Sequence, residues 1–184
     1  MPKILCFDLE TSKQLPAGCD LKAHMPLSIA LVAAVEEDGD KKVWHAVKSN
    51  GSPAKSATPE IANEVIEYLL CKQAAGYQIC GWNCIGFDLF CLASLAGDYE
   101  RCAQLARSVY DPMYQFYVLH GFPVGLESVA SVMVPGLTKV MPSVDIPARW
   151  LNGEHDIVIK HALRDCEMTI EVIKEINRRS EVVW

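Results

Sequence analysis

Residues 4–11 read Ile-Leu-Cys-Phe-Asp-Leu-Glu-Thr. The length of this run and its apolar, β-prone side chains predict a central, largely buried strand. Because side chains alternate along a strand, Asp8 and Glu10 should share one face, with Phe7 and Leu9 on the other. Two neighbouring carboxylates on a buried face repel each other and lose solvation. This face therefore predicts a bound divalent metal ion.

The composition limits the class of protein to which the chain can belong. A chain of 184 residues with 51% hydrophobic and 22% charged residues predicts one folded domain over residues 1–184, without a membrane span. The net charge of -6 excludes attraction of nucleic acid by the protein as a whole, so any phosphate binding needs local basic residues or metal ions. The eight cysteines form no CxxC pair and mostly lie in apolar runs, which predicts reduced thiols in an intracellular, cytoplasmic setting.

Strands are predicted in the first half of the chain, with helices around and after them. Beyond the first strand and a loop over 12–27, the patterns predict strands at 28–35, 42–47 and 77–82. A helix should begin at Pro59 after a Thr58 cap, and another should run from Asp88 to near Gly97. Further helices are predicted at 99–108, 112–120, 126–134 and 156–179. This order predicts a mixed α/β domain.

Two further acidic motifs follow the first. Residues 81–88 read Gly-Trp-Asn-Cys-Ile-Gly-Phe-Asp and lie where a strand ends and a helix begins, at the sheet edge where α/β folds usually bind ligands. On the last predicted helix, the spacing of four places His161 and Asp165 on one face. An imidazole beside a carboxylate can take a proton from water at neutral pH.

These three motifs, in this order, resemble those of the DEDD (DnaQ-like) 3′-5′ exonuclease superfamily. Residues 8–11, 83–88 and 161–165 are similar to its first, second and third motifs. Residues 124–130, the following Lys139, and 150–153 resemble the stretch before the third motif in stand-alone predicted exonucleases. The resemblance implies a ribonuclease H-like fold, a mixed sheet flanked by helices, over nearly the whole chain.

The resemblance also implies an activity: hydrolysis of phosphodiester bonds at the 3′ end of single-stranded DNA or RNA. Two divalent ions, Mg²⁺ or Mn²⁺, would be held by the four acids. A polymerase or a helicase is a possible partner. The residues implied are, for metal binding and catalysis, Asp8, Glu10, Asp88 and Asp165, with His161 as a further catalytic residue, and, for the terminal nucleotide and strand end, Leu9, Thr11, Asn83 and Phe87.

The third motif departs from the family pattern. The family usually has tyrosine four residues before the last aspartate or histidine five before it, whereas this chain has His161 at the tyrosine's spacing and Lys160 at the histidine's. The chain thus resembles the tyrosine branch with an altered side chain. Whether His161 is the general base or orients water stays open.

Simpler roles exist for each residue taken alone. Asp88 could only cap a helix, Asn83 could bond its own turn, and Phe87 could belong to the core. His161 could be a buried structural histidine, and Asp111 is interpreted as a helix start outside the site. The basic residues nearest the third motif, which are candidates for holding the nucleic-acid backbone, are Lys139, Arg149, Lys160 and Arg164.

Two other functions compete with the exonuclease. One is a structure-specific endonuclease on the same fold, which would cut internally instead of releasing mononucleotides stepwise. The other is a nucleic-acid-binding or polymerase-associated module with vestigial activity, which would fail to bind Mg²⁺ or Mn²⁺.

Overall fold

The sheet is built on β1 (Ile4–Thr11), the strand that carries the first acidic motif. A computed structural model of the chain describes residues 2–16 and 18–179, and within them the sheet has four strands in the order β3-β2-β1-β4. β2 (Ile29–Glu36) pairs antiparallel with β1 and with β3 (Lys41–Trp44), whereas β4 (Gln78–Cys80) runs parallel to β1. The sheet is therefore mixed, as predicted.

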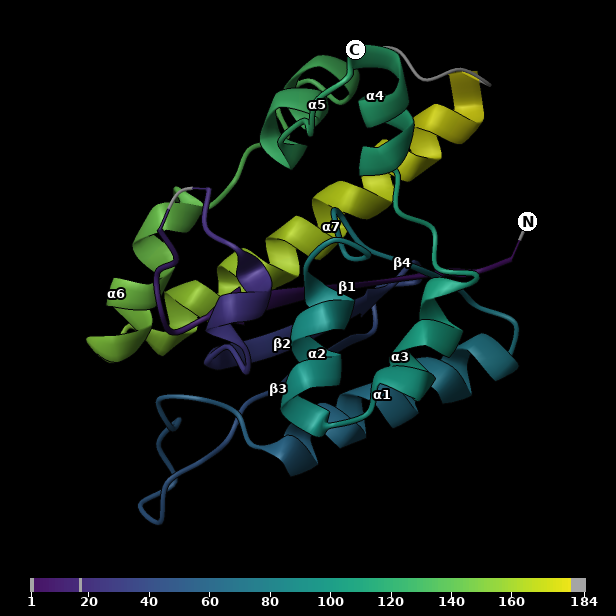
Figure 1. Cartoon of the computed structure of the whole chain (residues 1–184). Coiled ribbons are helices and arrows are strands. Elements are labelled where there is room, and N and C mark those ends of the chain that lie inside the picture. Colours follow the sequence, from purple (N-terminus) through teal and green to yellow (C-terminus); the bar gives the residue numbers. More distant parts are fainter. Residues whose placement is uncertain (1, 17, 180–184) are drawn as a thin grey trace.

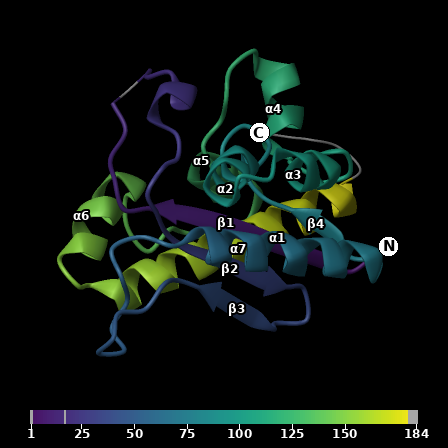
Figure 2. The same cartoon turned by 60° about the horizontal axis from the view of Figure 1, so that its bottom comes forward.

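Helices cover both faces of this sheet, and the alternation along β1 divides its side chains between them. Leu5, Phe7 and Leu9 pack with α1 (Pro59–Ala74), α2 (Asp88–Ala96) and α3 (Tyr99–Ala106) in one apolar cluster. Ile4 and Cys6 pack with α6 (Ile146–Leu151) and the long α7 (His155–Arg179) in another. Figures 1 and 2 show α7 on one side of the sheet and α1 on the other. Asp8 and Glu10 consequently belong to the face that α7 covers.

A third apolar cluster lies beyond the sheet. α4 (Met113–His120) and α5 (Leu126–Met133) pack with the C-terminal half of α7, where Phe116, Val129 and Met168 are buried together. In Figure 1 these two helices stand above the sheet, beside the later turns of α7. α4 and α5 thus form a wall next to the sheet.

Most predicted elements are confirmed, although several of them end earlier than predicted. Thr58 caps α1 by accepting the Ile61 N–H at 3.4 Å, and α2 ends at Gly97, whose φ of +70° provides the left-handed C-cap. β3 ends at Trp44 instead of residue 47, and β4 is limited to three residues, since neighbouring strands pair only there.

Three short helices went unpredicted. The loop over 12–27 contains a 3₁₀ turn, η1 (Leu21–His24), in which the Asp20 side chain accepts the Lys22 N–H. A second, η2 (Ser143–Asp145), leads into α6. Helices this short have too few residues to show a period of 3.6. Within the described residues, no helix is both long and apolar enough to cross a membrane.

Candidate active site

β1 directs its two carboxylates toward α7. Burial, reinforced by neighbouring acids, raises the pKa of Glu10 to about 8 and raises that of Asp8 well above its usual range. The Oδ2 atom of Asp8 is fully buried and has no hydrogen-bond partner within the described part of the chain. A carboxylate in this setting is stable only when a proton or a cation compensates its charge.

The second motif forms a tight loop between β4 and α2. Asn83 has a φ of +58°, a conformation that few residues other than glycine and asparagine adopt. A Cβ atom on Gly86 would lie 2.6 Å from Asn83 Oδ1, and one on Gly81 would lie 2.9 Å from the Phe7 carbonyl oxygen. The backbone oxygen beside Gly81 makes a side chain there costly, whereas a side chain at Gly86 would displace the Asn83 side chain. The loop ends at Asp88, the buried first residue of α2, whose pKa burial raises.

Asp111 holds this loop in place. Its Oδ1 accepts the Asn83 N–H at 2.9 Å and the Met113 N–H at 3.2 Å, and its Oδ2 accepts the Ile85 N–H at 3.0 Å. It lies there because the preceding Tyr110 forms a parallel bridge with Cys80 at the end of β4. Asp111 lies at the start of α4, as predicted, whereas its hold on the loop of the second motif was not predicted. The one sequence signal was an Asp-Pro pair after a short apolar run.

α7 contributes the third motif from the opposite side. His161 has no exposed surface, and its Nε2 lies 3.5 Å from Glu10 Oε1 and 3.6 Å from Asp165 Oδ2. Neither ring nitrogen forms a hydrogen bond with any described residue. Burial lowers the pKa of His161, which favours the neutral ring. The imidazole thus stands behind two predicted metal ligands.

Lys139 enters the same space from the loop before α6. Its ammonium group pairs with Asp165 and contacts Ser143 Oγ at 3.2 Å. Burial alone would lower its pKa, but the charges of Asp165, Asp8 and Glu10 outweigh burial and raise it. The other basic residues considered from the sequence lie outside the cavity: Arg149 pairs with Glu154, Arg164 donates to the Thr138 carbonyl oxygen, and Lys160 is not in the lining.

A cavity of about 330 Å³ lies where β1, the β4–α2 loop and α7 come together. It contains all four predicted acids and three of the four predicted substrate residues. Thr11, which donates to the Lys13 carbonyl oxygen, and the buried His161 are not part of its lining. Trp82, Leu126 and Ser143 are additional lining residues that the sequence did not single out. The complete lining is Asp8, Leu9, Glu10, Trp82, Asn83, Phe87, Asp88, Leu126, Lys139, Ser143 and Asp165.

The donor set of this cavity fits hard divalent cations. Carboxylate oxygens are the ligands that Mg²⁺ and Mn²⁺ prefer. Asp8 Oδ2 and Asp165 Oδ1 are buried and lack hydrogen-bond partners in the described residues, so they are available as ligands. No three of the four acids bring oxygen atoms within 4.8 Å of one another, so the oxygens do not converge on a single point.

Another acidic group lies on the β2–β3 turn. Glu36, Asp38 and Asp40 do bring carboxylate oxygens within 4.8 Å of one another. However, Glu36 accepts from the Tyr68 hydroxyl and pairs with Lys72, and Asp38 pairs with Lys3 at 2.9 Å. Lysines thus pair with two of these three carboxylates. The turn lies outside the cavity.

No family model matches the chain, and no curated protein matches its sequence. Solved structures do match its fold. The family B DNA polymerase from the hyperthermophilic archaeon Pyrobaculum calidifontis is 16% identical, with a TM-score of 0.66 over 96% of this chain and 25% of that chain. Exonuclease I is 15% identical, with a TM-score of 0.52 over 97% of this chain and 41% of that chain. The chain thus spans less than half of either protein. The predicted fold, a ribonuclease H-like mixed sheet flanked by helices, is confirmed.

Proposed function

We propose that this chain is a metal-dependent 3′-5′ exonuclease of the DEDD kind, acting on the ends of single-stranded DNA or RNA. One observation carries the proposal: β1, α2 and α7, far apart in the sequence, direct four carboxylates into one cavity. Among the described residues, Asp8 Oδ2 also lacks a hydrogen-bond partner, and so does Asp165 Oδ1, although the other oxygen of Asp165 pairs with Lys139. A purely structural arrangement would pair or neutralise such groups. Similarity in fold to exonuclease I and to part of a DNA polymerase agrees with this proposal.

The four acids would hold the divalent ions, Mg²⁺ or Mn²⁺. When bound, such ions activate water and stabilise the charge that develops on the phosphate. The apolar side chains of Leu9, Trp82 and Leu126 line part of the cavity, where they would limit access of water and so strengthen the electrostatic interactions inside. Lys139 adds a fixed positive charge beside Asp165, where a phosphate would otherwise meet only carboxylates.

Other residues of the chain would position the substrate. Asn83 and Phe87 line the cavity from the β4–α2 loop, and Leu9 lines it from β1. We assign these three to the terminal nucleotide and the strand end. For His161, complete burial behind Glu10 and Asp165 favours the orienting role over that of a general base exposed to water. Partners such as a polymerase or a helicase stay part of the proposal.

The proposal is tested by digestion of 5′-labelled single-stranded DNA and RNA oligonucleotides with Mg²⁺ or Mn²⁺. We expect a ladder that shortens from the 3′ end and disappears in EDTA. Loss of a residue that only hydrogen-bonds to a metal ligand lowers activity by about 10- to 100-fold. Asp165→Asn changes a proposed ligand itself, so it should lower turnover by more than about 100-fold. Asp156→Asn is the matched control, because it changes an exposed acid on the same helix.

Each alternative has its own outcome in this experiment. Internal cuts in place of a ladder would identify an endonuclease. Intact substrate under both metals, together with no metal binding by calorimetry, would identify a binding module. Unchanged turnover of the Asp165→Asn protein would overturn the assignment of the acids.

A further inference from the structure

α4 exposes two neighbouring tyrosines beside the cavity. Its buried side chains are Met113 and Phe116, whereas Tyr114 is 39% exposed and Tyr117 is 42% exposed. The two tyrosine rings lie one helical turn apart, with centroids separated by 6.4 Å. Aromatic rings are among the side chains that gain most from burial, so a pair left open on one helix face is suited to a ligand that covers them.

This tyrosine face, Tyr114 with Tyr117, is continuous with the cavity. The Tyr114 hydroxyl lies 3.0 Å from the position that a Cβ atom on Gly86 would occupy. Gly86 stands between Asn83 and Phe87, and both of these line the cavity. The tyrosine face therefore starts next to the loop that we assign to the end of the nucleic-acid strand. It extends along α4 away from that loop.

The helix that carries the rings is fixed to the cavity wall. Trp82, which lines the cavity, donates its indole N–H to the Val124 carbonyl oxygen at 2.9 Å. Its ring also packs against Phe116 of α4, with centroids 5.8 Å apart. The tyrosine face is thus held in a defined position relative to the acids. Such preorganisation is what a binding surface requires.

The segment that carries the tyrosine face has no acidic side chains to repel a polyanion. Residues 112–126 contain no aspartate or glutamate, although the whole chain has a net charge of -6. They contain no lysine or arginine either, so this segment itself supplies none of the usual ion pairs to phosphates. The two exposed rings offer contacts to flat apolar groups, and the bases of an unpaired strand supply these.

We propose that the tyrosine face is a stacking platform for the nucleotides that precede the 3′-terminal one in a single strand. This inference rests on the exonuclease function proposed above and adds a binding site for the upstream strand. Stacking does not depend on which base is present, because every base has a flat face. The platform would therefore bind without sequence preference and would reject a duplex, whose bases are already stacked.

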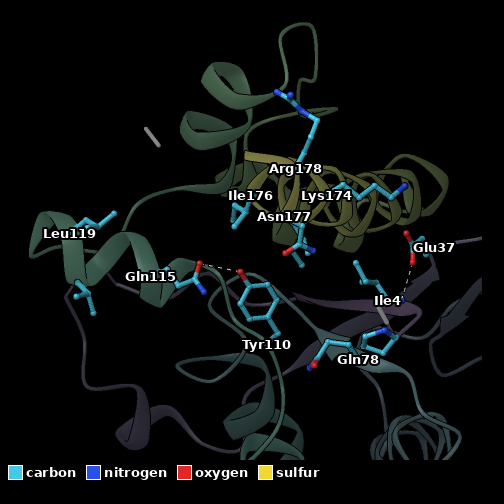
Figure 3. A pocket seen from close by; sticks show the side chains of 13 residues that line it. Ile4, Glu37, Gln78, Tyr110, Gln115, Leu119, Lys174, Ile176, Asn177 and Arg178 are labelled. Carbon is cyan, nitrogen blue, oxygen red and sulfur yellow. Dashed lines mark hydrogen bonds between the residues drawn. The ribbon is translucent and has the colours of Figure 1, made fainter. Parts of the chain in front are cut away.

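On the other side of α4 lies a larger groove. It has a volume of about 1260 Å³, and its lining includes Gln115, Val118 and Leu119 of α4 together with Ile176 of α7. Figure 3 shows Gln115 and Leu119 on α4 facing this groove, and the hydrogen bond that the Tyr110 hydroxyl donates to the Gln115 side chain. Val118 is 81% exposed. It therefore offers a matched control position on the same helix, outside the tyrosine face.

The test measures binding of labelled oligothymidylates of two, four and eight nucleotides to the Asp165→Asn protein, by fluorescence anisotropy in Mg²⁺. Affinity should rise with length. Adding Tyr117→Ala should weaken binding of the eight-nucleotide strand by about 5- to 150-fold, the range that loss of one stacked base gives, and should weaken binding of the dinucleotide less. Tyr117→Phe, which keeps the ring, and Val118→Ala should bind like the parent.

Three outcomes would overturn the platform: no gain of affinity with length in the parent, equal losses at all lengths in Tyr117→Ala, or no loss at all. A lipid or protein ligand for the tyrosine face would give the first of these. The exonuclease function fails separately, when the unmodified chain shortens no oligonucleotide. If it shortens them and Tyr117→Ala leaves the dependence on length unchanged, only the platform is refuted.

Discussion

At position 161, a fully buried imidazole stands between two carboxylates. Its Nε2 faces Glu10 and Asp165 at 3.5 and 3.6 Å, just beyond the usual length of a hydrogen bond. Burial lowers the pKa of His161, so the ring is neutral at pH 7 and can donate one N–H to either oxygen. We propose that a ring in this position orients the two carboxylates. It has no exposed surface from which to take a proton from bulk water.

Replacement of His161 by phenylalanine keeps most of the volume and removes both nitrogens. Partners that orient metal ligands are worth about 10- to 100-fold, and we expect a loss of turnover in that range. The dependence of kcat on pH should keep its shape, because an orienting group does not transfer the proton. Loss of one limb of that pH profile in His161→Phe would instead identify His161 as the general base.

At the scale of elements, the β4–α2 loop depends on one side chain from another segment. Asp111, at the start of α4, accepts three backbone N–H groups, two of them from this loop. Burial raises the pKa of Asp111, while the N–H groups of Ile85, Asn83 and Met113 act in the opposite direction. The loop carries Asn83 and Phe87 and ends at Asp88. Its conformation therefore decides where one of the four acids lies.

Asp111→Ala should leave these donors without their acceptor. We expect the free energy of unfolding to fall by about 2 kcal/mol, measured in urea, since unsatisfied buried donors cost about 1 to 3 kcal/mol. Turnover should fall as well under conditions where the protein stays folded, because Asp88 is displaced.

Asp98→Ala is the control for this change. Asp98 caps α3 by accepting the Arg101 N–H at 3.0 Å, away from the cavity. Its loss should cost about 1 kcal/mol of stability without lowering turnover. Equal turnover in folded Asp111→Ala and Asp98→Ala proteins would show that the loop does not need Asp111.

At the scale of the whole molecule, the carboxylates buried around the cavity repel one another when they are ionised. Burial first, and neighbouring acids second, raise the pKa of Asp8 and Glu10, and burial raises that of Asp88. A pKa raised by folding means that the folded state favours the protonated carboxyl. For Glu10, this contribution to stability is complete below the usual pKa of 4.5 and is lost as the pH rises toward about 8.

The protein without metal should therefore melt at a lower temperature as the pH rises from 5 to 8. Thermal melting in EDTA should show this fall, and Glu10→Gln should reduce it by several degrees, because glutamine does not titrate. Glu100→Gln, at an exposed site on α3, should keep the slope of the unmodified chain. Mg²⁺ or Mn²⁺ should raise the melting temperature most at pH 8. Parallel melting curves for Glu10→Gln and the unmodified chain would contradict the raised pKa.

The sequence by itself determined the main elements and the face on which the acids of β1 lie. Alternation placed Phe7 and Leu9 in the core opposite Asp8 and Glu10, and the Thr58-Pro59 cap located the start of α1. These features follow from contacts between residues near in sequence, which a local pattern records. The order of the three motifs also predicted the fold class, because the strand and helix junctions that carry them are part of the pattern.

Only the tertiary structure decided which other side chains join the predicted acids at the cavity. The contact of Lys139 with Asp165 joins residues 26 apart, and the hold of Asp111 on Asn83 joins residues 28 apart. The complete burial of His161 depends on how α7 packs against β1. No spacing within one element records such contacts, because they arise only when the sheet edge, the loops and α7 come together. Burial then changes the pKa values, so the electrostatics of the site belong to the folded molecule.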